Sequence, residues 1–221
     1  MSGASMYHLI VTPVGPFGYS VAERLRDLCH DVEVAGTGPS GTVVWPRVPD
    51  PAPPGPRLNL LVSWRRVPQI EREFDEESFR SGQPWLPVVL DHPVLEIGPV
   101  VVPGAGACHG CYVGRLAQHD AARAVRAAVG RHYDQDPGAG PAGYLPSTAL
   151  FAAAAAAEVV DRLRTSPAGE AGRVRRIDVP TQQLLSGRVV GVHGCPRCGL
   201  GRDETTRSYE RLPAILSGVW K

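Results

Sequence analysis

Short apolar runs alternate with amphipathic segments along the chain. Residues 7–12 form an apolar run that predicts a buried strand, and residues 19–28 carry apolar side chains at the three- and four-residue spacing of a helix. Residues 31–35 predict a second strand. A strand, a glycine-containing turn, a helix and a second strand, in this order, are typical of the start of a doubly wound α/β fold.

The same alternation continues after residues 36–56, a region rich in Gly and Pro in which residues 42–45 predict an edge strand. Further strands are expected over residues 57–63, 87–90, 94–97, 100–102, 173–179 and 187–192, with 94–97 and 100–102 forming a hairpin-like pair. Helices are expected over residues 69–80, 112–133 and 147–163. An apolar C-terminal stretch, from Leu212 to Trp220, predicts a segment that docks on this domain or on a partner.

Two glycines in the turn after the first strand, Gly15 and Gly18, could mark a vestigial nucleotide-binding turn. In doubly wound folds, the phosphates of a nucleotide lie on the helix N-terminus that follows this turn. The pattern G-x-G-x-x-G is incomplete, however, and Pro13 and Pro16 remove amide donors that a phosphate would need. Packing of strand against helix is therefore the favoured interpretation of the turn, and nucleotide binding is the alternative.

Several other polar or small-residue segments have a structural interpretation. The alanine-rich helix at 147–163 is expected to pack inside its own domain, with contact to a second copy as the alternative. Trp64, Arg65 and Arg66 end an expected strand, where open sheets often bind ligands, but the favoured interpretation is a surface aromatic beside two solvated arginines. A solvated helix face is expected at Asp75, Glu76 and Glu77.

Composition and charge exclude some classes of partner. The 221 residues are 43% hydrophobic and carry a formal net charge of +1, so the chain has no general attraction to nucleic acid or to an anionic membrane. Apolar stretches are interrupted well before the length of about 18 residues that a membrane span needs. Because the first residues lack the basic and apolar regions of a signal peptide, a cytoplasmic protein is expected.

Two Cys-x-x-Cys pairs, Cys108 with Cys111 and Cys195 with Cys198, are the strongest chemical signal in the chain. Four thiolates are the tetrahedral ligand set that Zn²⁺ prefers, and they leave no open position for catalysis, so a structural zinc site is predicted. Two buried thiol pairs or a dithiol redox pair are the alternatives. Cys29 is left as a buried thiol, and the histidines inside or beside the cysteine turns, His109 and His193, are expected to support the site rather than to bind the metal.

The segments that carry these cysteines also resemble a known family. Residues 98–115, with Gly-Pro, Pro-Gly, Cys-x-x-Cys and Arg in order, and residues 192–199, with Cys-Pro-x-Cys-Gly, are similar to the ThiF-type partner proteins of YcaO cyclodehydratases. These proteins belong to pathways for thiazole- and oxazole-containing ribosomal peptides. The resemblance implies the α/β fold of ubiquitin-activating-type adenylating enzymes, a homodimer, a zinc tetrad, and a chain that performs no chemistry but presents a precursor peptide to the ATP-using YcaO subunit.

The resemblance implies a single ThiF-like domain over residues 1–221, with a reduced nucleotide-fold half at 1–57 and a zinc-bearing half at 58–221. Family members usually carry a winged-helix leader-binding domain ahead of the α/β part, whereas here the first strand is expected near Tyr7. Leader recognition is therefore expected from a separate protein or from an exposed sheet edge. The alternatives are an adenylating enzyme that acts on the C-terminus of a peptide or carrier protein, and a zinc ribbon that contacts nucleic acid. Neither nucleic acid nor membrane is expected as a partner.

Overall fold

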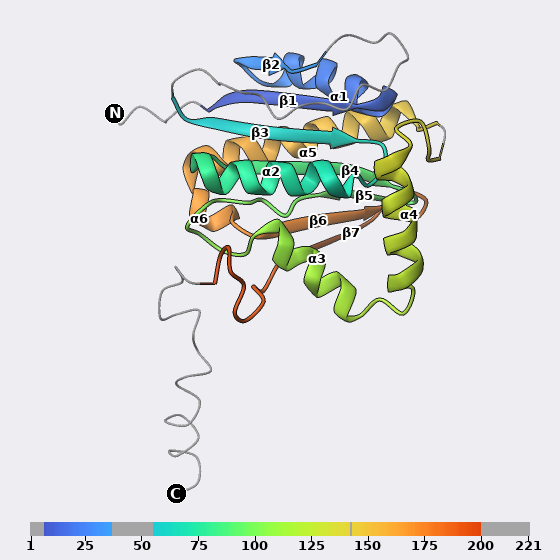
Figure 1. The fold of residues 1–221 in the computed structure, drawn as a ribbon. Coiled ribbons are helices and arrows are strands. Elements are labelled where there is room, and N and C mark those ends of the chain that lie inside the picture. Colours follow the sequence, from blue (N-terminus) through green and yellow to red (C-terminus); the bar gives the residue numbers. More distant parts are fainter. Residues whose placement is uncertain (1–6, 37–54, 142, 200–221) are drawn as a thin grey trace, which may run out of the picture.

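The computed structural model describes residues 7–36, 55–141 and 143–199 and is built on one seven-stranded sheet (Figure 1). The strands lie in the order β2-β1-β3-β4-β5-β6-β7. Their bounds are β1 His8–Val14, β2 Val32–Val34, β3 Arg57–Ser63, β4 Trp85–Asp91, β5 Val94–Ile97, β6 Arg173–Asp178 and β7 Gln183–Arg188. The pairs among β2, β1, β3 and β4 are parallel, whereas β4 to β7 form an antiparallel series.

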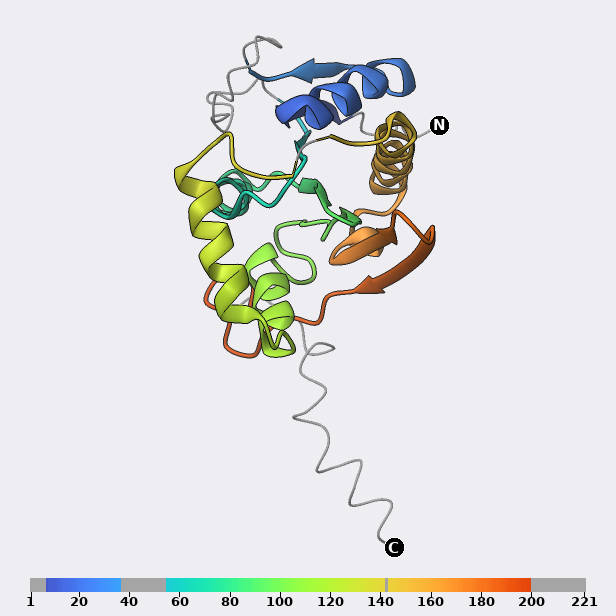
Figure 2. The ribbon, with the colours of Figure 1, turned by 90° about the vertical axis from the view of Figure 1, so that its right-hand side faces the viewer.

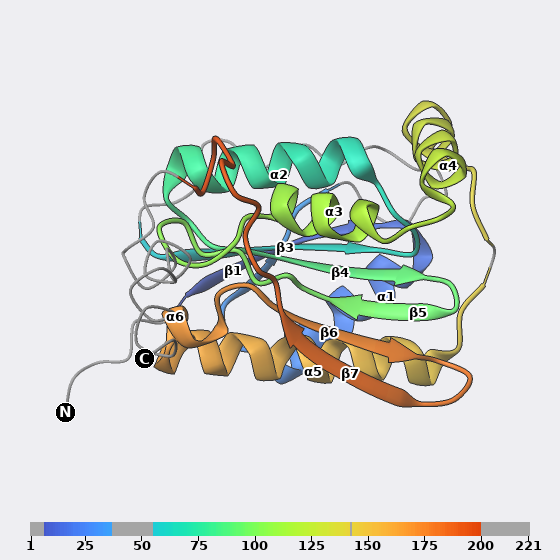
Figure 3. The ribbon, with the colours of Figure 1, turned by 90° about the horizontal axis from the view of Figure 1, so that it is seen from below.

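Helices cover both faces of the sheet (Figures 2 and 3). One face carries α1 Gly15–Leu28, α5 Pro146–Thr165 and the short α6 Pro167–Glu170; the other carries α2 Pro68–Ser81, α3 His109–Gln118 and α4 Arg123–Gln135. The central strands β1, β3 and β4 are buried almost throughout, because parallel strands with helices on both faces have no solvent-facing side. The predicted α/β class, with central strands covered on both faces, is therefore confirmed.

The alanines of α5 form its contact with α1. Ala149, Ala152, Ala153 and Ala156 are fully buried, and their small side chains let the two helices approach closely. This confirms the expectation that the alanine-rich helix packs inside its own domain. Leu150 and Phe151 lie on the outer side of α5 and are about half exposed.

Two sequence-based expectations about the strands were wrong in detail. Strand β5 pairs with β4 and β6 rather than with residues 100–102, of which Val101 forms an isolated bridge to Trp85. The strand expected over residues 187–192 begins earlier, as β7, and ends at Arg188. The expected edge strand at 42–45 and the apolar C-terminal stretch lie outside the described residues.

The helix expected over residues 112–133 is two helices, α3 and α4. Asp120 lies at the break, where its Oδ1 accepts a hydrogen bond from the Ala122 N–H at 2.9 Å and its Oδ2 pairs with Arg126. This contact is an Asx turn, which redirects the chain just before the N-cap residue of α4, Ala122. Because apolar residues recur at helical spacing on both sides of the break, periodicity did not reveal it. Among the described residues, no helix combines the length and apolar character that a membrane crossing requires.

Candidate metal centre and its surroundings

Four cysteine side chains from two distant segments meet beside α2. Cys108 precedes α3 and Cys111 lies in its first turn, while Cys195 and Cys198 lie in the turns after β7. Their four Sγ atoms lie within 4.8 Å of one another, with 3.7 Å between Cys108 and Cys195 and 3.3 Å between Cys111 and Cys198. All four are free thiols, since a disulfide would need a sulfur separation of about 2.05 Å.

The sulfur positions and their hydrogen bonds fit a metal ion. Tetrahedral zinc with bonds of about 2.3 Å holds its sulfurs about 3.8 Å apart, close to the separations found here. Backbone amides also point at the sulfurs: the N–H of Cys108 donates to Cys198 Sγ at 3.5 Å, and the N–H of Val192 donates to Cys111 Sγ at 3.2 Å. Such donors offset thiolate charge, as second-shell partners do at metal sites. The predicted clustering of these four cysteines as a possible metal site is therefore confirmed.

Three of the sulfurs differ in how readily they lose a proton. Hydrogen bonds, first from the Cys108 thiol and then from the Cys108 backbone, lower the pKa of Cys198 to about 4. The hydrogen bond to Cys198 raises the pKa of Cys108, and burial raises that of Cys111. Cys198 therefore loses its proton readily, whereas Cys108 and Cys111 hold theirs. A divalent cation supplies the charge that allows all four sulfurs to ionise.

Both cysteine turns are fastened to α2 through one carboxylate. Asp75 Oδ1 accepts a hydrogen bond from the backbone N–H of His109 at 3.1 Å, and Oδ2 pairs with the Arg197 guanidinium. A second guanidinium nitrogen of Arg197 lies 3.2 Å from Glu76 Oε1. Asp75 is only 1% exposed, so the expectation of a solvated face at Asp75, Glu76 and Glu77 was wrong for this residue.

His109 supports the site from within the core, as expected. Its ring lies 5.2 Å from the ring of Trp85, measured between centroids, and also contacts Tyr112. Its Nε2 lies 3.4 Å from Glu71 Oε2, and burial lowers the pKa of the imidazole. His109 therefore packs beneath the first cysteine turn and is not one of the clustered ligands.

Arg65 is buried and Arg66 is partly buried, and both are paired within the fold, which corrects their interpretation as solvated arginines. Arg65 is 1% exposed and donates hydrogen bonds to the carbonyl oxygens of Tyr133 at 3.0 Å and Asp136 at 3.1 Å. Arg66 pairs with the buried carboxylate of Glu96, which also accepts a hydrogen bond from the hydroxyl of Tyr112. These ion pairs and hydrogen bonds hold the ends of β3, β5, α3 and α4 together. The two arginines therefore serve the fold rather than a ligand site.

The turn after β1 is filled by the chain itself. Gly15 has φ +70°, and a Cβ there would lie 2.4 Å from the Trp64 ring; a Cβ on Gly18 would lie 2.5 Å from the Val62 carbonyl oxygen. The Trp64 indole is held in place by a hydrogen bond from Nε1 to the Pro141 carbonyl at 3.0 Å. Close packing accounts for both glycines, and a nucleotide-binding role for them stays a prediction.

The fold is shared with heterocyclases and with a component of a microcin synthetase. No family model matches the chain, and no curated protein matches it. Among solved structures, a heterocyclase in complex with substrate and cofactor aligns with 23% identity and a TM-score of 0.60, over 89% of this chain and 25% of that one. The heterocyclase TruD aligns with 18% identity and a TM-score of 0.62, over 94% and 32%. A chain of the E. coli microcin synthetase McbBCD complex aligns with 16% identity and a TM-score of 0.60, over 88% and 70%.

These likenesses define the class of the protein as a ThiF-like α/β fold that carries a four-cysteine cluster. This chain spans only 25% and 32% of the length of the two heterocyclase chains that it aligns with. The resemblance inferred from the two cysteine-bearing segments thus leads to the same group of proteins as the comparison of folds.

Proposed function

We propose that this chain is a zinc-binding scaffold subunit, without catalysis of its own, in a cyclodehydratase-type complex that modifies ribosomal peptides. The four-cysteine cluster carries the proposal, because it binds two distant segments to α2 in a fold shared with heterocyclase and microcin synthetase components. Four thiolates complete a tetrahedral zinc site and leave no coordination position for substrate. The residues that would hold the ion are Cys108, Cys111, Cys195 and Cys198.

The surroundings of α1 support a scaffold over an adenylating enzyme. Phosphates bind at a helix N-terminus through free backbone amides. Here the Trp64 ring packs onto Gly15, and the hydroxyl of Tyr144 donates a hydrogen bond to the Pro16 carbonyl at 3.3 Å. A nucleotide at this turn would have to displace both aromatic side chains.

The proposal names the partners that follow from the family resemblance. The chain would act as a cytoplasmic homodimer that docks with a YcaO-type cyclodehydratase or a related modifying enzyme. The precursor peptide would bind to the complex, either through this chain or through a separate leader-binding protein. The similarity in fold to heterocyclases supports a modifying enzyme as the main partner.

Metal analysis tests the cofactor. Elemental analysis of the purified chain should give one zinc ion per chain. Cys198→Ser should lose it, whereas Cys29→Ser, which changes the cysteine outside the cluster, should keep it. A wild-type chain purified without metal under reducing conditions would refute the zinc site.

Co-purification and nucleotide exchange test the role. The chain should co-purify with a YcaO-type subunit, and light scattering should show the dimer. Peptide-dependent exchange of ATP and pyrophosphate should be absent for the chain alone. Exchange that depends on peptide and is lost in Gly15→Trp would establish the adenylating alternative instead.

A further inference from the structure

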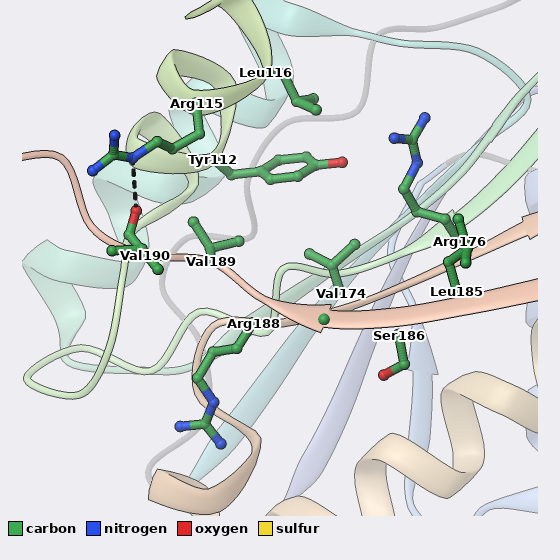
Figure 4. Close-up of a pocket in the computed structure, with 11 residues that line it drawn as sticks. Tyr112, Arg115, Leu116, Val174, Arg176, Leu185, Ser186, Arg188, Val189 and Val190 are labelled. Carbon is green, nitrogen blue, oxygen red and sulfur yellow. Dashed lines mark hydrogen bonds between the residues drawn. The ribbon is translucent and has the colours of Figure 1, made fainter. Parts of the chain in front are cut away.

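An open groove of about 440 Å³ lies between α3 and the ladder of β6 and β7, next to the cysteine cluster (Figure 4). Apolar side chains make up much of its lining. They are Tyr112, Leu116, Val174, Leu185, Val189 and Val190. Leu185 and Val190 are about 70% exposed, which is unusual for large apolar residues beside a structural site.

Strand register shows which side chains face this groove. Val174 pairs with Gly187, so these two residues share the face of the sheet that Tyr112 covers. Ser186 points to the opposite face (Figure 4). A Cβ built on Gly187 would meet no atom within 4 Å. The floor of the groove at Gly187 is therefore open backbone.

The charge of the groove is positive. Arg115 and Arg176 lie at opposite ends of it, with the Tyr112 ring between them (Figure 4), and the described residues that line it include no acidic side chain. Arg115 donates to the carbonyl oxygens of Val190 at 3.1 Å and Gly191 at 2.9 Å and forms no ion pair with the described residues. Arg176 lies 3.4 Å from a carboxylate that also pairs with Arg66. Arg115 thus leaves one end of the groove with a positive charge that no described carboxylate balances, whereas at the other end Arg176 shares the Glu96 carboxylate with Arg66.

The groove also borders a sheet edge. Strand β7 is the last strand of the sheet, and all six of its residues are exposed. An edge strand presents backbone donors and acceptors that an extended peptide can pair with, while pockets beside the edge receive its side chains. Backbone pairing and an apolar, cationic groove therefore occur side by side.

The cysteine cluster sets the position of both walls. Helix α3 starts beside Cys108 and carries Cys111 in its first turn, while the chain after β7 runs through residues 189–192 to Cys195. The N–H of Val192 donates to Cys111 Sγ at 3.2 Å, which joins the two walls directly. A metal ion shared by the four sulfurs would hold the groove at a fixed width.

We propose that this groove binds an extended segment of the precursor peptide that alternates acidic and apolar residues. The peptide would add as a strand to β7, seat an apolar side chain against Tyr112 and Val174, and place carboxylates near Arg115 and Arg176. This inference rests on the proposed function, since it names the surface that takes the peptide. Charge complementarity to the two arginines selects this ligand over an apolar segment of a second copy.

The test uses the full chain with zinc and a fluorescein-labelled twelve-residue peptide of alternating Glu and Val. Fluorescence anisotropy should show binding that weakens about tenfold in Gly187→Tyr, because the new ring occupies the groove. Ser186→Tyr, on the opposite face of the same strand, should bind within about twofold of wild type. Equal binding by wild type and Gly187→Tyr would overturn the proposal.

Charge and occupant are tested separately. A peptide with Gln in place of Glu should bind more weakly than the Glu peptide. Arg176→Gln should reduce this difference in affinity between the two peptides. The control variant Arg131→Gln, on α4, should leave the difference unchanged. A photo-crosslinker at Leu185 should capture the peptide. Capture of a second copy, or of residues 200–221, while the peptide is present would overturn the assignment. Co-purification with the modifying enzyme but no peptide binding would refute the groove and leave the scaffold role standing.

Discussion

Arg197 contacts the carboxylate of Asp75, a residue 122 positions earlier in the chain. Arg197 lies between Cys195 and Cys198, so this ion pair fixes the second cysteine turn on α2. The same carboxylate accepts the backbone N–H of His109 in the first cysteine turn. One buried carboxylate therefore contacts both cysteine turns and fixes their positions on α2.

Asp75→Ala should lower the free energy of unfolding by about 2–4 kcal/mol, because it leaves the buried N–H of His109 without its acceptor and removes the buried partner of the Arg197 guanidinium. Asp75→Asn keeps an acceptor for the His109 N–H and should cost less. Glu76→Gln, at a residue whose side chain is 56% exposed, should cost less than about 1 kcal/mol. Urea denaturation of the metal-bound chain measures all three; equal losses for the Ala and Glu76 variants would contradict the role given to Asp75.

Chelation of the metal should loosen the cluster without unfolding the sheet. Cys108 and Cys111 form a small apolar cluster with Ala107, Val189 and Val192, distinct from the main core, which extends over both faces of the sheet. Hydrogen exchange should therefore increase over residues 108–116 and 189–198, while amides of β1, β3 and β4 keep their protection. Mass spectrometry with and without a zinc chelator measures this, and loss of protection across the central strands would show that the metal stabilises the whole fold instead.

Elements whose evidence is local were predictable from the sequence. The helix expected over residues 69–80 is α2, Pro68–Ser81, and the helix expected over 147–163 is α5, Pro146–Thr165. Apolar spacing and alanine content determine such helices with little help from distant contacts. The cysteine cluster was predictable for a related reason, since a two-residue spacer already suits both sulfurs of a pair to one metal.

Buried charges were not predictable, because their partners are distant in the chain. The buried carboxylate of Glu96 pairs with Arg66, 30 residues earlier, and that of Asp75 pairs with Arg197. A charged residue at the end of a strand or on a polar helix is predicted to be solvated, because the sequence does not show the distant partner that neutralises its charge. The same reason explains the groove between α3 and β7, whose two walls come from segments more than sixty residues apart.

Gly15→Ala should destabilise the protein more than Gly82→Ala. Both glycines have φ near +70°, so both variants pay the left-handed strain of about 1–2 kcal/mol. Gly82 has open space around it, whereas the new methyl at Gly15 would press against the Trp64 ring and add about 1–3 kcal/mol of overpacking. Thermal and urea unfolding compare the two variants, and Trp64→Phe should relieve part of the difference. Equal losses would mean that the indole moves aside freely.

Stability should depend on pH through His8 at the edge of the sheet. The Nε2 of His8 lies 3.0 Å from Glu33 Oε2, and its Nδ1 lies 2.9 Å from Asp31 Oδ1. The hydrogen bond to Glu33, followed by the contact with Asp31, raises the pKa of His8 above its usual 6.5. Because the folded state holds this proton more tightly, the stabilisation is complete below pH 6.5 and is lost as the pH rises through the raised pKa.

The measurement is the difference in unfolding free energy between wild type and His8→Gln, taken from pH 6 to pH 9. That difference should shrink as the pH rises, and an NMR titration of the His8 ring should place its midpoint above 6.5. His119→Gln, at an exposed histidine on the far side of the sheet, controls for loss of a ring. A difference that grows with pH would contradict this prediction, because it would mean that the fold prefers the neutral ring. Two flanking carboxylates should instead favour the charged ring.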